Sequence, residues 1–267
     1  MKFSIVTPLL DGARFLKSAI TSLQAQSHGD YEHLIIDAGS KDGSIEIVQA
    51  ATARDPRIRL VEIAGCPLYR AIDAGFERSD GEMLAWLNSD DLYAPWALAT
   101  VAKYARARKD CRWFAGLPGC WDEDGALRYV RPEGWRPRFL IRGGWFHKDL
   151  LGFLQQETMF FRRDLYFDLD EADRAAFGEA RLAGDFILWK RLAKRASLSV
   201  IPSALGGFRR HGANKSTIFM SDYMAEVRKD GSVNVPWPFT GIVRRSYRLA
   251  SAAYAEKLAG REDAAFY

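Results

Sequence analysis

Four polar residues, Asn88-Ser89-Asp90-Asp91, follow an apolar run at residues 82–87. The run is short enough to be a buried strand, so two adjacent carboxylates would lie at the mouth of the core. There they repel each other and lose hydration, and something should compensate them. A divalent cation would do so, because oxygen-rich sites at strand ends suit Mg²⁺ or Mn²⁺. The alternative is that these residues cap the following helix, as their types often do.

The first hundred residues alternate the patterns of strands and helices. Apolar runs at 3–6, 34–36, 58–61 and 82–87 predict buried strands, and helical spacing predicts helices at 15–23, 45–52 and 68–76. This alternation favours βαβ units in a mostly parallel sheet. Ligands of such sheets bind beyond the carboxyl ends of the strands. The polar residues after three strands should therefore meet in one site: Thr7-Pro8, residues 37–40 and residues 88–91.

The pattern changes after about residue 109. Residues 112–115 and 127–130 flank a turn signal at 122–125 and predict a hairpin. A strand is expected at 198–201 and an amphipathic helix at 186–192. The stretch at residues 134–147 lacks periodicity and is typical of a functional loop. Its aromatic residues would either stack on a ligand or join the core: Trp135, Trp145 and Phe146.

The composition excludes several classes of protein. Of the 267 residues 48% are hydrophobic, which suffices for a sizeable core. Lys and Arg number 38 and Asp and Glu 34, so a net charge of +4 gives no reason to expect a nucleic-acid partner. The three cysteines form no CxxC pair, which fits a reducing cytosol. No GxGxxG, P-loop or GxSxG motif is present, which disfavours dinucleotide binding, P-loop chemistry and a serine nucleophile.

An ordered set of short motifs resembles the family 2 glycosyltransferases, among them sugar transferases of bacterial surface polysaccharides. The motifs lie at residues 4–8, 35–44, 68–75, 87–91, 156–162, 184–189 and 206–211. The resemblance implies an α/β protein with the GT-A fold, in which helices flank a mostly parallel central sheet, followed here by a C-terminal helical extension. It also implies an inverting enzyme that takes a sugar from a nucleotide-diphosphate donor.

The resemblance gives donor-binding roles to residues at the strand ends. Asp37 resembles the residue that accepts the N–H of a uracil base, so a UDP-linked sugar is expected; an ordinary strand-end turn is the alternative. Thr7 and Pro8 would line the base pocket. Asn88 or Asp91 would lie near the ribose or behind the metal.

Two further donor-site candidates depart from the family pattern. Arg70 stands where an acidic residue is common, and would contact the phosphates or face solvent. Asp73 stands where Asn is more frequent, close to the nucleotide in the motif.

Asp90 takes the last place of a DxD-like element and is the implied ligand of Mn²⁺ or Mg²⁺. Such a cation would bridge the diphosphate and neutralise the leaving group. Asn88, where Asp is commoner, keeps an oxygen donor with less negative charge. Arg209, Arg210 and His211 would clamp the departing diphosphate, with His211 as a metal ligand or phosphate donor. A solvated basic loop is the alternative.

Inversion needs a base that takes the proton of the attacking acceptor hydroxyl. The resemblance makes Asp185 that base, and a helix N-cap is the alternative. The family often has an acidic residue immediately before this Asp, where this chain has Gly184. Glu157 and Glu179 are the next candidates for the base.

The chain from Pro238 predicts a separate amphipathic helix. Its apolar stripe is Val243, Tyr247, Ala250, Tyr254 and Leu258, with Arg244, Arg245, Arg248, Lys257 and Arg261 around it. This pattern is typical of a helix on an anionic lipid surface, and packing on the catalytic domain is the alternative. No apolar run reaches the roughly 18 residues of a membrane span. We therefore expect a cytoplasmic protein, with peripheral contact through residues 238–261 at the inner face of the cell membrane as an option.

These observations give one expected organisation and one expected function. Residues 1–108 would bind the nucleotide sugar, residues 109–220 would hold the acceptor and the base within the same GT-A domain, and residues 221–267 would form the helical tail. The expected function is inverting, metal-assisted transfer of a sugar from a nucleotide-sugar donor to a glycan or lipid-linked sugar acceptor. The alternative is a catalytically silent module that binds sugar nucleotides or acts as a scaffold. Asp37, Asp90 and Asp185 argue against it, because all three stand in place.

Overall fold

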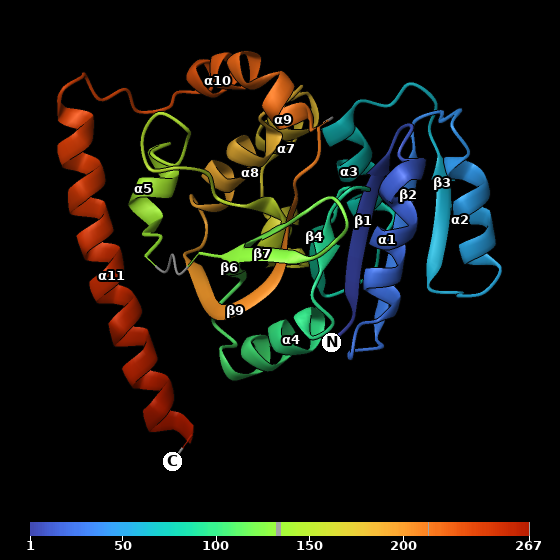
Figure 1. The fold of residues 1–267 in the computed structure, drawn as a ribbon, viewed down its shortest axis with the longest axis horizontal. Helices are drawn as coiled ribbons and strands as arrows, with labels where there is room; N and C mark the ends of the chain where they lie inside the picture. The colour runs from blue at the N-terminus through green and yellow to red at the C-terminus, as the bar shows by residue number, and fades with distance from the viewer. Residues whose placement is uncertain (132–134, 213, 267) are drawn as a thin grey trace.

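The computed structural model describes residues 1–131, 135–212 and 214–266, without the side chains of residues 215, 216 and 255–266. The side chains of Lys257, Leu258 and Arg261 in the tail therefore lie outside the described part. One sheet runs through the body, helices cover both of its faces, and a long helix, α11 (Phe239–Phe266), lies along one edge (Figure 1).

The first half of the chain builds the parallel part of the sheet, as the sequence predicts. Its elements are β1 (Phe3–Leu9), α1 (Ala13–Gln24), β2 (Tyr31–Asp37), α2 (Ser44–Thr52), β3 (Ile58–Glu62), α3 (Leu68–Glu77), β4 (Met83–Trp86), β5 (Leu92–Tyr93) and α4 (Ala97–Ala107). The strand order begins β3-β2-β1-β4, and these four strands pair in parallel. Their carboxyl ends therefore meet at one edge of the sheet.

Every residue of β1, β2 and β4 is buried, because helices cover both faces of this part of the sheet. Successive side chains alternate between the faces. Met83 and Ala85 of β4 pack toward α1 and α4, whereas Leu84 and Trp86 pack toward α3 and the second half of the chain.

The second half extends the sheet with strands of mixed direction. Its elements are β6 (Trp113–Trp121), β7 (Leu127–Val130), α5 (Arg138–Arg142), the 3₁₀ turn η1 (Gln156–Thr158), β8 (Met159–Arg162), α6 (Arg163–Phe167), α7 (Glu171–Gly178), α8 (Gly184–Leu192), β9 (Leu198–Arg209), α9 (Lys215–Ile218) and α10 (Met220–Lys229). The order continues β4-β8-β6-β9-β5, and β7 pairs with β6 as the predicted hairpin. The strand expected at 198–201 runs on to Arg209, so the Gly-Gly stretch at 206–207 is strand rather than loop.

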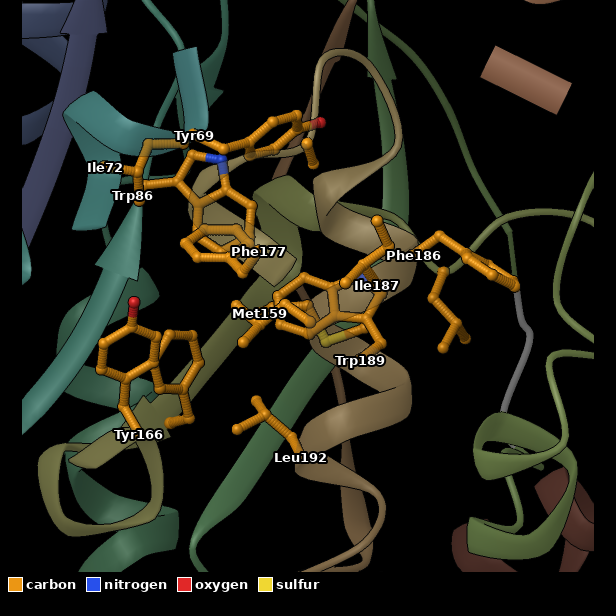
Figure 2. Close-up of a cluster of buried hydrophobic side chains, with 14 of the residues drawn as sticks. Tyr69, Ile72, Trp86, Met159, Tyr166, Phe177, Phe186, Ile187, Trp189 and Leu192 are labelled. Atoms are coloured by element: carbon orange, nitrogen blue, oxygen red, sulfur yellow. The ribbon is translucent and has the colours of Figure 1, made fainter. Parts of the chain in front are cut away.

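A cluster of large aromatic rings joins α8 to the sheet. Trp189 of α8 stacks on Trp86 of β4, with ring centroids 5.3 Å apart, and on Trp113 of β6 at 5.6 Å. Figure 2 shows Trp189 with Met159, close to Trp86 and Phe177, between these elements. Helix α8 is thereby fixed relative to the end of β4. The polar residues 88–91, here called the acidic turn, follow that strand.

The tail divides into two helices with different surroundings. Tyr223, Met224 and Val227 of α10 belong to the main core, so this helix is part of the body. On α11, the ring of Tyr247 packs against Trp135 and Phe146 at 6.0 and 5.8 Å.

The expectation that aromatic residues of this stretch serve as sugar platforms is therefore wrong for Trp135 and Phe146, which receive the tail helix. Trp145 also packs against the core. No helix in the described chain combines the length and the apolar composition that crossing a bilayer requires.

Candidate active site

An open pocket of about 1320 Å³ lies at the carboxyl ends of the parallel strands. Seven of the residues that the sequence nominates line it: Pro8, Asn88, Asp90, Asp91, Asp185, Arg210 and His211. The strand-end prediction thus locates the pocket, and the two halves of the domain both contribute to its walls.

Asp90 and His211 meet across 121 residues of sequence. The Nε2 atom of His211 lies 3.0 Å from Oδ2 of Asp90. The pairing of β5 with β9 brings them together, since Leu92 lies opposite Gly207 and Tyr93 opposite Gly206. At Gly206 a Cβ atom would lie 2.5 Å from the carbonyl oxygen of Glu157, so only glycine allows this close approach.

The ring of Phe15 contacts the imidazole of His211, with centroids 4.5 Å apart. His211 is therefore held between a ring on one side and a carboxylate on another. A carboxylate and an imidazole at one point are ligands that a divalent cation accepts.

Asn88 supports the turn from its other side. Its Nδ2 atom donates to Oδ2 of Asp91 at 3.0 Å and to Oε1 of Gln156 at 3.1 Å. Both amide hydrogens are used, so the amide oxygen is the atom left for a ligand. The helix-cap alternative is wrong here, because α4 begins at Ala97 and its N-cap residue, Trp96, makes no side-chain cap.

The residues present fit Mn²⁺ or Mg²⁺ bound together with a diphosphate. Among the described residues, no three His, Cys, Asp or Glu side chains form a complete protein cage. A cation that keeps waters and takes substrate phosphate oxygens needs only one or two protein ligands. Asp90 and His211 would supply these two.

Asp91 lies buried behind the turn. Its Oδ1 accepts the backbone N–H of Arg209 at 2.9 Å, which ties the acidic turn to β9. Burial raises the pKa of this carboxyl well above its usual value, and the nearby carboxylates of Glu157 and Asp90 act in the same direction. Asp91 therefore holds the turn in place at the back of the pocket.

Asp185 is the second residue of α8 and faces the same pocket. The N-cap residue is Ala183, and no side chain caps the helix from that position, so the N-cap alternative is wrong for Asp185. Its Oδ1 instead accepts a hydrogen bond of 3.0 Å from the hydroxyl of Tyr223. Burial raises the pKa of Asp185 to about 6, and hydrogen bonds from Phe186 and Tyr223 oppose this rise. A carboxyl group with a pKa near the working pH is suited to general-base catalysis.

Both reserve candidates for the base also line the pocket. Burial raises the pKa of Glu157 to about 7. Its Oε2 atom makes no hydrogen bond within the described part of the chain. Glu179 lies at the end of α7. Position alone therefore does not single out Asp185.

Three of the nominated donor residues at or near strand ends lie outside the pocket lining in the described structure. Asp37 is 1% exposed, and its carboxylate accepts from the N–H groups of Gly39 at 2.7 Å and Ser40 at 3.0 Å, so it forms the strand-end turn that was the alternative. The Thr7 hydroxyl is paired at 2.8 Å with buried His33. These groups hold the strand ends, and contact between their side chains and a nucleotide stays a prediction. The third is Arg209.

Arg209 is only 2% exposed and lies over the ring of Phe15 at 4.8 Å, so it is neither solvated nor placed among the lining residues. Arg210, the next residue, does line the pocket. Arg209 is the last residue of β9 and packs on Phe15, whereas Arg210 lies just beyond the strand and lines the pocket.

Arg70 and Asp73 form an ion pair on α3 at 3.1 Å, outside the pocket lining. Asp73 is buried and accepts a second hydrogen bond of 2.6 Å from the Tyr166 hydroxyl. Asp73 thus links α3 to α6, whereas Arg70 pairs with it within α3, and contact of either residue with a nucleotide stays a prediction.

Two residues on α10 were not predicted from the sequence. Tyr223 reaches Asp185, and Glu226 accepts backbone hydrogen bonds from the residues before α8. They lie in a helix without any recognisable motif, so only the tertiary structure reveals them.

The model of the family "Glycosyl transferase family 2" matches residues 4–167, more than half of the chain. This chain belongs to glycosyl transferase family 2. The matched part of this glycosyltransferase contains the acidic turn and Glu157. Asp185 and His211 lie beyond it, so their roles rest on the geometry and on the resemblance of short motifs.

Relatives and solved structures agree with this assignment. The O-antigen biosynthesis protein RfbC of Myxococcus xanthus is 32% identical over 102 residues, which are 37% of this chain and 8% of that protein. S. aureus TarS 1-349 in complex with UDP-GlcNAc superposes with a TM-score of 0.62 at 13% identity, over 92% of this chain and 71% of that one. The mannosyltransferase PcManGT from Pyrobaculum calidifontis, in complex with GDP-Man and Mn²⁺, has a TM-score of 0.58 at 16% identity, over 99% and 80%.

At these identities the structural similarities establish the fold alone, and that fold is the predicted GT-A type. The chain spans less than half the length of the curated relatives that it matches. Donor, acceptor and partners of the whole protein are therefore matters of proposal.

Proposed function

We propose that this glycosyltransferase transfers a sugar with inversion of configuration at the anomeric carbon. In this proposal Asp185 is the general base, and Asp90 and His211 hold Mn²⁺ or Mg²⁺. The observation that carries the proposal is that these three side chains line one pocket at the carboxyl edge of the sheet. A donor diphosphate near the Asp90–His211 pair and an acceptor hydroxyl near Asp185 would then meet within a single cavity.

The chemistry assigns one task to each side of the pocket. Asp185 accepts the proton of the acceptor hydroxyl while the acceptor oxygen forms a bond to the anomeric carbon of the donor sugar. The bond from that carbon to the diphosphate oxygen breaks on the opposite face. A bound divalent cation would neutralise charge on the leaving diphosphate. Arg210 lines the same pocket and adds a positive charge for that group.

A UDP-linked sugar remains the favoured donor. The UDP-GlcNAc in the TarS complex supports this choice, and the GDP-Man in the PcManGT complex makes a guanosine donor the competing one. Asp37 would accept the N–H of a uracil base, and it also fixes the turn that leads to Ala38, which lines the pocket. Thermal-shift screening against UDP- and GDP-sugars with Mn²⁺ distinguishes the two donors.

The acceptor that we propose is a glycan or a lipid-linked sugar of the cell envelope. The O-antigen role in the name of the Myxococcus relative supports this class of acceptor. We further propose that the protein is cytoplasmic and touches the inner face of the membrane through residues 238–261. Free cysteines at positions 66, 111 and 120 suit a reducing compartment.

The variant Asp185→Asn tests the central assignment. Asn keeps the shape of the side chain but cannot accept a proton at neutral pH, so turnover should fall by about 10² to 10⁴. Donor affinity should change little, because the groups proposed to hold the donor are elsewhere. Turnover is measured as nucleotide release from the donor found by thermal shift, with a panel of glycan and lipid-linked acceptors. Donor affinity is measured with the same donor.

The same experiment exposes the alternatives. A variant that works at the wild-type rate would transfer the role of base to Glu157 or Glu179. Donor binding without any acceptor-dependent turnover in the wild-type protein would favour a silent binding module.

A further inference from the structure

Helix α10 contacts the proposed base directly. The hydroxyl of Tyr223 donates to Oδ1 of Asp185 at 3.0 Å. The Tyr223 ring is 9% exposed, lines the pocket and meets the ring of Phe153 edge-on at 5.6 Å. A phenol fixed in this way holds one oxygen of the Asp185 carboxylate in a defined position.

Glu226, one turn further along α10, holds the backbone that leads into α8. Its carboxylate accepts the N–H groups of Arg181 at 2.8 Å, Leu182 at 2.8 Å and Ala183 at 3.1 Å. The three N–H groups belong to residues that precede α8, so the Glu226 carboxylate fixes the segment that leads into this helix.

The far end of α10 is attached to the same helix. Oδ2 of Asp230 accepts from Nζ of Lys190 at 2.8 Å and from Nη1 of Arg191 at 2.9 Å. Both contacts lie on α8, and Figure 1 shows α10 beside α8 at the same end of the body. α10 is thus attached at two points, with Tyr223 close to the first of them.

The residue before the base fits this arrangement. At Gly184 a Cβ atom would lie 2.5 Å from the ring of Tyr69, whose hydroxyl donates to the carbonyl of Leu182 at 2.8 Å. A side chain at position 184 is therefore excluded. The carboxylate near the start of α8 comes instead from Glu226.

We propose that α10 is the element that positions the base: Tyr223 orients the carboxylate of Asp185 and stabilises its charged form, and Glu226 fixes the segment that carries it. The inference rests on the proposed role of Asp185. It makes Tyr223 and Glu226 positioning residues of the transfer reaction.

Other ionisable groups also face Asp185. Glu226 and Glu157 are close enough to act on it electrostatically, as is Tyr69 of α3, while Glu179 and Arg181 line the same pocket. The carboxylates disfavour the charged form of Asp185, whereas the Tyr223 hydrogen bond favours it. Removing the phenol hydroxyl should therefore raise the pKa of Asp185.

The pH–rate profile of Tyr223→Phe is the deciding measurement. Without the hydrogen bond the acidic limb of kcat should move up by about 1 pH unit, the size expected for one hydrogen bond to a charged group. Turnover should thus fall about tenfold at pH 5.5 and much less at pH 8.5, with the donor KM unchanged. Tyr31→Phe is the matched control: it removes a buried hydroxyl that makes no hydrogen bond to the described residues, and its limb should stay in place.

Glu226→Gln tests the second contact. One amide oxygen cannot replace a carboxylate that accepts three N–H groups, so kcat should fall about tenfold or more at every pH while the donor KM stays constant. For Tyr223→Phe, an acidic limb that stays in place would overturn the proposal that Tyr223 stabilises the charged form of Asp185, whether or not kcat falls. An unmoved limb together with an inactive Asp185→Asn overturns this inference alone, whereas an active Asp185→Asn overturns the assignment of the base itself.

Discussion

At the scale of single residues, the carboxyl group of Asp185 is subject to two opposing effects. Burial favours its neutral form, and the hydrogen bonds from Phe186 and Tyr223 favour its charged form. Burial prevails, and the pKa of the group rises to about 6. The charged form is the one that can accept a proton from an acceptor hydroxyl, so activity should depend on pH in this range.

We expect kcat to fall as the pH is lowered through about 6, because Asp185 then gains a proton and loses its function as a base. Glu157, with a pKa raised to about 7, titrates nearby and needs a control. The pH–rate profile of Glu157→Gln should keep the limb near 6. Loss of that limb in Glu157→Gln would identify Glu157 as the titrating base.

The same pKa predicts a sign for stability. The folded state binds the proton of Asp185 more tightly than the unfolded state does, so ionisation of this group weakens folding above about pH 6. Asp185→Asn should therefore melt at the same or a higher temperature than wild type at pH 8, and the difference should shrink toward pH 4. Melting curves at the two pH values test this, and a variant that is less stable at pH 8 would contradict it.

Asp90 gives a third prediction at this scale. Chelation should abolish transfer, and Asp90→Ala should reduce it at least 10²-fold, because the variant would lose one of the two proposed ligands of the cation. Binding of Mn²⁺ in the presence of UDP, followed by electron paramagnetic resonance, should weaken in parallel. Asp124→Ala, at an exposed hairpin position, is the control. Full turnover in excess chelator would refute the metal assignment.

At the scale of elements, the geometry of the site depends on how α8 is attached to the sheet. Trp189 stacks on Trp86 of β4 and Trp113 of β6, so one side chain links the base helix to the strand that precedes the acidic turn. Both halves of the pocket therefore share one cluster of rings. A substitution in that cluster should therefore reduce the free energy of unfolding more than it reduces donor affinity.

Trp189→Ala should reduce the free energy of unfolding by about 3–5 kcal/mol, the usual loss for a large aromatic removed from a core. For a domain of this size the melting temperature should drop by roughly 10 °C. Trp237→Ala is the matched control, because Trp237 is 87% exposed and its removal should change stability by less than about 0.5 kcal/mol. Similar melting temperatures for the two variants would disprove the role given to the cluster.

At the scale of the whole molecule, α11 has one face on the body and one face in solvent. Tyr247 packs on Trp135 and Phe146, and Nε of Arg244 donates to the carbonyl of Leu150 at 2.9 Å. The outer side carries exposed apolar and basic residues: Phe239, Ile242, Arg245, Arg248 and Leu249. Trp237, which precedes the helix, is exposed as well. Packing of the tail and binding to a lipid surface are therefore compatible, because they use different faces.

We expect weak, salt-sensitive binding to vesicles that contain anionic lipid. The double variant Arg245→Gln, Arg248→Gln should weaken it by about tenfold or more, since each basic residue near such a surface contributes on the order of 1 kcal/mol. Arg128→Gln, at an exposed position of the hairpin, should leave binding unchanged. Co-sedimentation measures all three proteins. Equal binding of all three would rule out contact through α11.

Local pattern determined the parallel half of the fold and the edge on which the site lies. Strands such as β1 and β4 are buried on both faces, so their sequences are short apolar runs. The polar residues that follow these runs mark the carboxyl edge of the sheet. The ordered motifs added Asp90, Asp185 and His211. The family match confirms the enzyme class that these motifs suggested.

Only the tertiary structure decided which side chains enter the pocket. The contact between Asp90 and His211 spans 121 residues, and the contact between Tyr223 and Asp185 joins two helices. Such contacts depend on how elements distant in sequence are oriented and packed, which leaves no periodic trace in either segment. The same reason applies to residues that the motifs nominated but that do not line the pocket. Asp37 and Arg209 stand next to lining residues, and the direction of one side chain decides whether a group faces the ligand or the core.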